Sequence, residues 1–169
     1  FTATDAQGFA VSRVEPTVGL TLAAGEAAHP RSVGGGQTFA WTGTLNVLSP
    51  GKYRFDAAVL GDLTVTVGGK PVLTAKAAGD DPAAAERATG PEVELAAGIQ
   101  LFSATLTRTG KAARAELVWS GPGFRPEPVP YFFFGHLPRS RGPGFDLDMS
   151  YEHGRFLFEE LSCVRCHQA

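Results

Sequence analysis

Apolar and polar residues alternate in short runs along the chain, from about residue 19 to residue 137. In residues 63–67, Leu-Thr-Val-Thr-Val, the apolar side chains fall on one face of an extended strand and the threonines on the other. Residues 101–107 alternate in the same way. The pattern predicts half-buried β-strands within residues 20–25, 37–48, 51–61, 62–77, 92–108, 114–121 and 129–137.

Glycine and proline separate these runs. The chain has 21 Gly and 12 Pro, which favours short strands joined by turns over a helical fold. Gly68-Gly69 can supply the positive φ angles of a tight hairpin, and Ser49-Pro50-Gly51 predicts another turn. Seven or more strands at this spacing predict an all-β fold of the β-sandwich type.

Residues 80–88, DDPAAAERA, depart from this pattern. An aspartate that can cap a helix, followed by proline and alanines, predicts one or two helical turns or a loop between strands. The paired aspartates also suggest a calcium site. A helix start explains them more simply, because Ca²⁺ takes about six to eight oxygen ligands.

Several of the predicted strands carry motifs that resemble the PA14 family, a β-sandwich or barrel-like module of secreted proteins, adhesins and carbohydrate-active enzymes. The motifs are Trp-x-Gly, Gly-x-Tyr-x-Phe, a hairpin ending in Gly-Lys, a turn at a glycine and a late Leu-x-Trp, and they comprise Trp41, Gly43, Gly51, Tyr53, Phe55, Gly69, Lys70, Gly98, Leu117 and Trp119. The resemblance covers residues 8–138 and implies a PA14-like β-sandwich or barrel.

The resemblance also bears on ligands. Sugar-binding members of the family hold calcium with two adjacent acidic residues shortly after the Tyr-x-Phe strand, and those positions here are Leu60 and Gly61, with a lone Asp62 beyond. We therefore do not expect calcium. Strand alternation in residues 131–134, Tyr-Phe-Phe-Phe, would turn Tyr131 and Phe133 to one face. Core packing is the default interpretation of that run, and an exposed platform for sugar is the alternative.

The chain changes character after residue 138. Residues 139–149 are rich in Pro, Gly and Arg and predict a linker, while residues 150–169 switch to helical spacing. We therefore expect three parts: a PA14-like β domain over 1–138, a linker over 139–149, and a short C-terminal helix with a Cys-x-x-Cys-His motif over 150–169.

That motif is the strongest chemical signal in the chain. Its spacing allows Cys163 and Cys166 to form thioethers with haem c, and it places His167 as the proximal ligand of the iron. A thioredoxin-like pair, a structural zinc site and chance are the alternatives. The predicted helix before the motif disfavours the first, three available ligands disfavour the second, and the presence of both cysteines of the chain in one motif disfavours the third.

The residues before the motif resemble the opening of a class I cytochrome c. Gly154 and Phe158 hold the places at which that family packs its first helix against its last. The distal iron ligand is unknown, because Met149 and His153 lie about 21 Å and 15 Å before Cys163 along a continuous helix. We expect the chain to be the front part of a longer protein whose continuation completes the cytochrome domain.

Composition narrows the function further. A net charge of −2 without a basic stripe excludes a nucleic-acid partner, and no apolar run is long enough to span a bilayer. We expect an exported, periplasmic or extracellular protein that transfers electrons to a redox partner or fused oxidoreductase and docks through its β domain, for instance on polysaccharide. The alternative is a carbohydrate- or protein-binding module without redox activity. Catalysis is not expected, since nothing marks Glu92 and Glu94 as a catalytic pair.

Overall fold

The computed structural model describes residues 1–32 and 36–136. Over these residues the chain is all-β, as the alternating pattern predicts. The strands are β1 (Thr2–Thr4), β2 (Ala10–Ser12), β3 (Gly19–Leu22), β4 (Thr38–Val47), β5 (Gly51–Val67), β6 (Lys70–Ala77), β7 (Glu86–Leu95), β8 (Gly98–Thr107), β9 (Ala113–Gly121), β10 (Phe124–Pro128) and β11 (Phe134–Gly135). The expected linker and the expected helix with the Cys-x-x-Cys-His motif lie outside the described residues.

Two single-turn 3₁₀-helices complete the described chain: η1 (Pro82–Ala84) and η2 (Tyr131–Phe133). No helix within residues 1–32 and 36–136 has the length and apolar character needed to cross a membrane.

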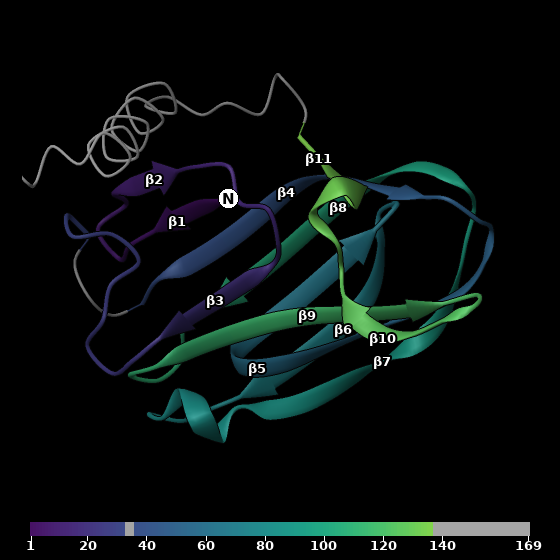
Figure 1. The fold of residues 1–169 in the computed structure, drawn as a ribbon. Coiled ribbons are helices and arrows are strands. Elements are labelled where there is room, and N and C mark those ends of the chain that lie inside the picture. The colour runs from purple at the N-terminus through teal and green to yellow at the C-terminus, as the bar shows by residue number, and fades with distance from the viewer. Residues whose placement is uncertain (33–35, 137–169) are drawn as a thin grey trace, which may run out of the picture.

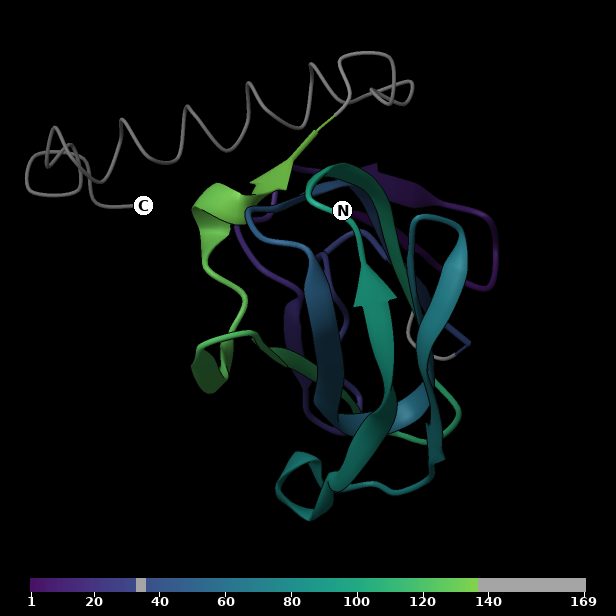
Figure 2. The same cartoon turned by 90° about the vertical axis from the view of Figure 1, so that its right-hand side faces the viewer.

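The long strand β5 connects the two layers of the fold. Its first part, up to Leu60, pairs with β7 and β9, and its last part, from Gly61 onward, pairs with β6 and β8. The strand order is β10-β9-β5-β8-β4-β1-β2, with β3 on β9 and β11 on β4, and every pair is antiparallel. The strands therefore form one sheet that curls into two layers (Figures 1 and 2).

Gly61 marks the point where β5 passes from one layer to the other. Its φ is 127°, and a Cβ there would lie 2.6 Å from the carbonyl oxygen of Thr107. Only glycine satisfies both conditions. Leu60 and Gly61 are both buried. They are the two positions that correspond to the calcium-binding acidic pair of sugar-binding PA14 domains, and here they belong to the core.

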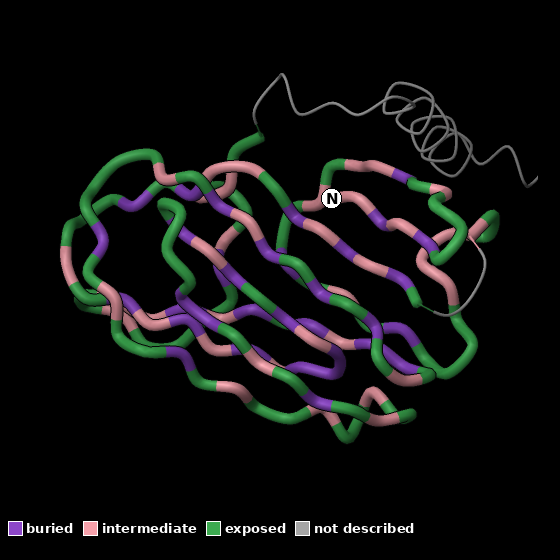
Figure 3. The backbone as a smooth tube through the Cα atoms, turned by 180° about the vertical axis from the view of Figure 1, so that it is seen from behind, coloured by how far each residue is buried: buried purple, intermediate pink, exposed green. Residues whose placement is uncertain are grey.

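The core lies between the two layers and follows the predicted alternation (Figure 3). Phe39, Leu45, Phe55 and Leu63 are among its largest fully buried side chains. Trp119 lies at the centre of an aromatic cluster, with ring centroids 5.1–6.4 Å from those of Tyr53, Phe55, Phe124 and Phe133. Such tilted and stacked pairs stabilise beyond their buried area.

The prediction of a strand over residues 129–137 is wrong for most of the described part of that segment, which forms a 3₁₀ turn followed by a two-residue strand. Proline at 130 has no N–H to give to a strand ladder, and the carbonyl of Pro130 instead accepts the N–H of Phe133 in a 3₁₀ turn. Only Phe134 and Gly135 pair as a strand, with β4. The expected alternation of the aromatic side chains therefore fails here.

The helical turn expected near Asp80 is confirmed as η1. Asp81 caps it by accepting the N–H of Ala83 at 2.9 Å, and Asp80 accepts the N–H of Lys111 at 3.1 Å. The hydrogen bonds from Lys111, the one from its backbone N–H first, lower the pKa of Asp80. Both views place η1 at the opposite end of the body from β11 (Figures 1 and 2).

Candidate functional site

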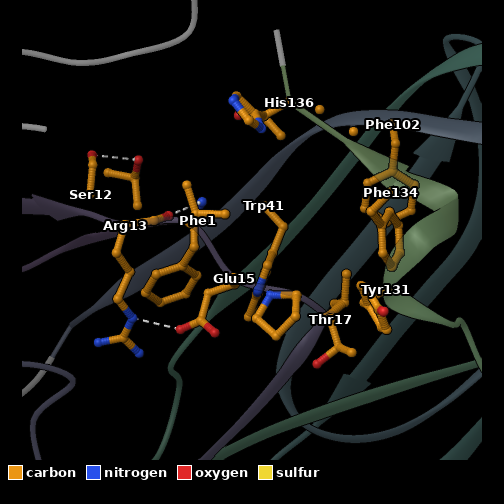
Figure 4. Close-up of a pocket in the computed structure, with 17 residues that line it drawn as sticks. Phe1, Ser12, Arg13, Glu15, Thr17, Trp41, Phe102, Tyr131, Phe134 and His136 are labelled. Carbon is orange, nitrogen blue, oxygen red and sulfur yellow. Dashed lines mark hydrogen bonds and ion pairs between the residues drawn. The ribbon is translucent and has the colours of Figure 1, made fainter. Parts of the chain in front are cut away.

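A pocket of about 340 Å³ opens beside β4, at a point where no strand of the described chain pairs with the edge of β4 that faces away from β8. β1 pairs with β4 at residues 38–40, and β11 pairs with it at Thr44 and Leu45. Residues 41–43 of β4 lie in the gap between these two short strands. The pocket is therefore formed by a break in the sheet, and the segment that follows β2 lines its other side (Figure 4).

Aromatic rings make up much of the pocket wall. Trp41 lies on β4, and its ring centroid is 5.0 Å from that of Phe1. Phe102 on β8 and Phe134 on β11 meet edge to face at 5.0 Å. All four line the pocket. The wall is thus apolar and is built from residues far apart in the sequence.

Polar groups line the opposite side and the rim. The guanidinium of Arg13 donates from Nε to Oε1 of Glu15 at 2.6 Å and lies 5.0 Å from the centroid of the Phe1 ring. The hydroxyls of Thr2 and Ser12 share a hydrogen bond of 2.9 Å. Arg13 and Glu15 compensate each other, so this ion pair adds polar groups to the pocket with little net charge of its own.

The residues from Tyr131 to Phe134, here called the aromatic turn, border the pocket through Tyr131 and Phe134. The ring centroid of Phe133 lies 5.2 Å from that of Trp119, and the ring centroid of Phe134 lies 5.0 Å from that of Phe102. These two rings anchor the turn against the core. The other two point outward: Tyr131 is 68% exposed and Phe132 is 66% exposed, with their rings edge to face at 5.6 Å. The turn holds two adjacent aromatic rings in solvent at a fixed position.

The structure places only some of the residues that were expected to carry chemistry. Cys163, Cys166 and His167 lie outside the described residues. Glu92 is paired with Arg54 at 3.2 Å, and Glu94 is opposite Lys52 in the ladder between β5 and β7, so both belong to a charged strand face. Asp62 forms an ion pair with Lys76 at 2.7 Å. Residues 1–32 and 36–136 contain no group of three or more His, Cys, Asp or Glu side chains that could hold a metal ion.

Sequence reasoning missed most of the pocket. Trp41 was noted only as part of a family motif, and Arg13 and Glu15 were not noted at all. Arg13 and Glu15 lie in an irregular segment after the short strand β2, so no periodicity marks them. Prolines at 128 and 130, on either side of buried Val129, were the one available signal that the following aromatic residues form a turn.

No protein-family model matches the sequence, and no curated protein matches it. Solved structures share its fold. An anti-sigma factor domain-containing protein from Clostridium clariflavum aligns with a TM-score of 0.66 at 15% identity, over 80% of this chain and 46% of that one. The PA14 domain of the MpAFP antifreeze protein aligns with a TM-score of 0.58 at 12% identity, over 71% of this chain and 70% of that one.

A PA14 sugar-binding domain from an RTX adhesin aligns with a TM-score of 0.54 at 21% identity, over 67% of this chain and 62% of that one. The described chain has a PA14-like fold. This confirms the fold expected from the sequence motifs. The chain spans less than half of the length of the two anti-sigma factor domain-containing proteins that it resembles. None of these similarities concerns a cytochrome c domain.

Proposed function

We propose that the PA14-like body is a non-catalytic carbohydrate-binding module whose site is the pocket together with the aromatic turn. One observation carries the proposal: Tyr131 and Phe132 are exposed and adjacent, Tyr131 lines the pocket, and the partly buried rings of Phe133 and Phe134 hold the turn in place. The PA14-like fold supports it, because one protein that shares the fold is a sugar-binding domain of an adhesin.

The geometry suits a sugar ring. The C–H face of a pyranose can stack on an exposed aromatic ring, and the pocket beside it supplies hydroxyls and an ion pair for hydrogen bonds. The anchored turn is already in place before binding, so little conformational entropy is lost when the ligand arrives. Two large apolar side chains held in water at one spot are also uncommon away from binding sites.

Binding of the 169-residue chain to an array of neutral and acidic glycans, with calcium and with EDTA, tests this function. We expect binding that EDTA does not remove. Tyr131→Ala and Phe132→Ala should each weaken it about tenfold, as loss of a stacking anchor does. Leu48→Ala is the matched control, since Leu48 is 67% exposed but belongs neither to the pocket lining nor to the aromatic turn. An array without any response would overturn carbohydrate binding and favour a protein partner.

We further propose that Cys163, Cys166 and His167 attach haem c. The support is the motif itself: two thiols and an imidazole at this spacing are the donor set for two thioethers and one axial ligand. Haem attached in this way would supply one-electron transfer to a redox partner or fused oxidoreductase. Attachment requires export, in agreement with the adhesin origin of one protein that shares the fold.

Expression of the intact gene product in a host that matures c-type cytochromes tests the attachment. A haem stain of the denatured protein should be positive for the natural sequence and negative for the double variant Cys163→Ser, Cys166→Ser. A natural sequence that does not stain would refute it. The carbohydrate proposal does not depend on this result.

A further inference from the structure

The outward face of the layer formed by β4, β8, β5 and β6 is rich in hydroxyl groups. Strand register aligns Thr42, Ser103 and Thr66 in one row across β4, β8 and β5. It aligns Thr105, Thr64 and Thr74 in the next row, across β8, β5 and β6. These six residues are here called the hydroxyl face. Four of them are exposed, and the other two, Thr66 and Ser103, share a hydrogen bond of 2.7 Å.

This face carries little charge. One row further on, Thr107 is followed by Asp62 and Lys76, and these two form an ion pair with each other at the edge of the layer. The other layer of the molecule is different, because its outward positions hold ion pairs such as Arg54–Glu92 and Arg114–Glu116. The two outer surfaces therefore differ in chemistry although both are built from strands of the same sheet.

The hydroxyl face is continuous with the pocket. A shallow depression of about 330 Å³ lies on it, lined by Thr42, Thr66, Ser103 and the exposed side chain of Leu101. Thr42, with its neighbour Gly43, lines both this depression and the pocket of the aromatic turn. A ligand that leaves the pocket at Thr42 therefore enters the depression directly.

Leu101 and Ile99 add exposed apolar area at one end of the same face. They are 63% and 75% exposed, and both project from β8 on the side that carries Ser103 and Thr105. Alternate residues of a strand share a face, so this assignment follows from the register. A surface that combines hydroxyls, methyl groups and a few larger apolar side chains matches the two chemical faces of a sugar ring.

We propose that the hydroxyl face is a second binding surface, which takes an uncharged polysaccharide chain as it leaves the pocket. This rests on the proposed function of the pocket and extends it from a sugar residue to a polymer. Threonine and serine hydroxyls can exchange hydrogen bonds with sugar hydroxyls, while their carbon atoms contact the C–H faces. No strongly hydrated ion needs to be stripped of water, which would be costly.

The shape of the layer favours a flexible chain over a crystalline surface. Neighbouring strands rotate by about 20–25° relative to one another, so four strands turn through roughly 60–75°. A flat lattice contacts only part of such a surface, whereas a single polymer chain can follow the twist. Each contact is weak, and the gain comes from several contacts made by one tethered chain.

The test compares a neutral glucan polymer, a tetrasaccharide of the same glucan and an acidic alginate, each bound to the 169-residue chain. The double variant Thr64→Val, Thr105→Val removes two neighbouring hydroxyls and keeps side-chain shape and strand propensity. Thr21→Val, Thr89→Val is the matched control, because both threonines are exposed on the other layer. Circular dichroism and thermal unfolding should show both double variants folded.

We expect the dissociation constant for the polymer to rise about tenfold in Thr64→Val, Thr105→Val, as loss of two modest hydrogen bonds predicts. Tetrasaccharide binding should be unchanged, and so should polymer binding by the control. Unchanged polymer binding, or tighter binding of alginate than of the glucan, would overturn the hydroxyl face while leaving the pocket intact. Failure of both glucans to bind would instead overturn the function proposed for the pocket.

Discussion

The backbone of Gly43 in β4 lies against the carbonyl oxygen of Gly135 in β11, with no space between them for a side chain. Both glycines line the pocket, and their contact fixes β11, which begins at the last residue of the aromatic turn. The reverse contact is looser, because a Cβ on Gly135 would meet the hydroxyl of Thr44 at 2.6 Å, and a hydroxyl can rotate away.

Gly43→Ala should therefore displace β11 and the aromatic turn with it. We expect a loss of about 1–3 kcal/mol in the free energy of unfolding, as for other overpacked sites, and a larger loss of glycan affinity than stability alone explains. Gly135→Ala is the control and should cost less on both measures. Chemical denaturation and calorimetric titration compare them, and equal effects of the two variants would contradict this view of the contact.

Trp119 links the core to the aromatic turn through Phe133, 5.2 Å from centroid to centroid. Trp119→Leu removes that support together with the contacts to Tyr53 and Phe124. We expect about 3 kcal/mol of destabilisation, as for other large-to-small changes at buried aromatic positions. The rings of Tyr131 and Phe132 should then become mobile, which their NMR line widths can report. Phe132→Leu is the control, because it changes an exposed ring and should leave stability within about 0.5 kcal/mol of the natural chain.

Much of the strand layout was readable from the sequence. The alternation in residues 63–67 placed one face of β5 correctly, because a long strand with a buried side repeats its pattern enough times to be recognised. The Gly68-Gly69 hairpin was equally clear, and both residues have positive φ, at 58° and 76°. Local chemistry decides these features.

The pocket was not readable for a physical reason. It unites residues 12–18, residues 41–43, Tyr131 and residues 134–136, and β1 and β2 are three residues each, too short to show a period. Its outer wall depends on a 3₁₀ turn where alternation predicted a strand. A break between two short strands on one edge exists only in the tertiary structure, so neither propensity nor spacing could indicate it.

Tyr53 should make stability fall at alkaline pH. Burial raises the pKa of its phenol above the ordinary value of 10.0, and its hydroxyl donates to the carbonyl oxygen of Ser49 at 2.7 Å. The neutral form is thus favoured in the folded state, so its contribution is fully present below the ordinary tyrosine pKa and is lost as the pH rises through the folded-state pKa.

Urea denaturation at several values between about pH 8 and pH 11 measures this loss. Tyr53→Phe removes the ionisable group, so the variant should show a shallower decline over the same range. It should also be about 1 kcal/mol less stable at neutral pH, since it leaves the Ser49 carbonyl without its donor. Parallel pH curves for the two proteins would rule out a role for this residue.

Arg108 holds residues 23–26, which follow β3, onto the end of β8. Its guanidinium is buried and donates to the carbonyl oxygens of Glu26 at 2.6 Å and Ala23 at 3.0 Å, and to Oε1 of Gln37 at 3.3 Å. Burial lowers the pKa of Arg108. Replacement by methionine keeps a long, unbranched side chain at this position. It removes the donor groups that these acceptors use.

We expect Arg108→Met to reduce the free energy of unfolding by about 2–4 kcal/mol, because buried acceptors that lose a charged donor are costly. Arg108→Lys should recover part of this, since an ammonium can serve some of the same carbonyls. Hydrogen exchange in residues 23–32 should rise in Arg108→Met well before global unfolding. Glycan binding at the pocket should persist, because Arg108 does not line it, and a loss of binding without loss of fold would show that the two regions are coupled.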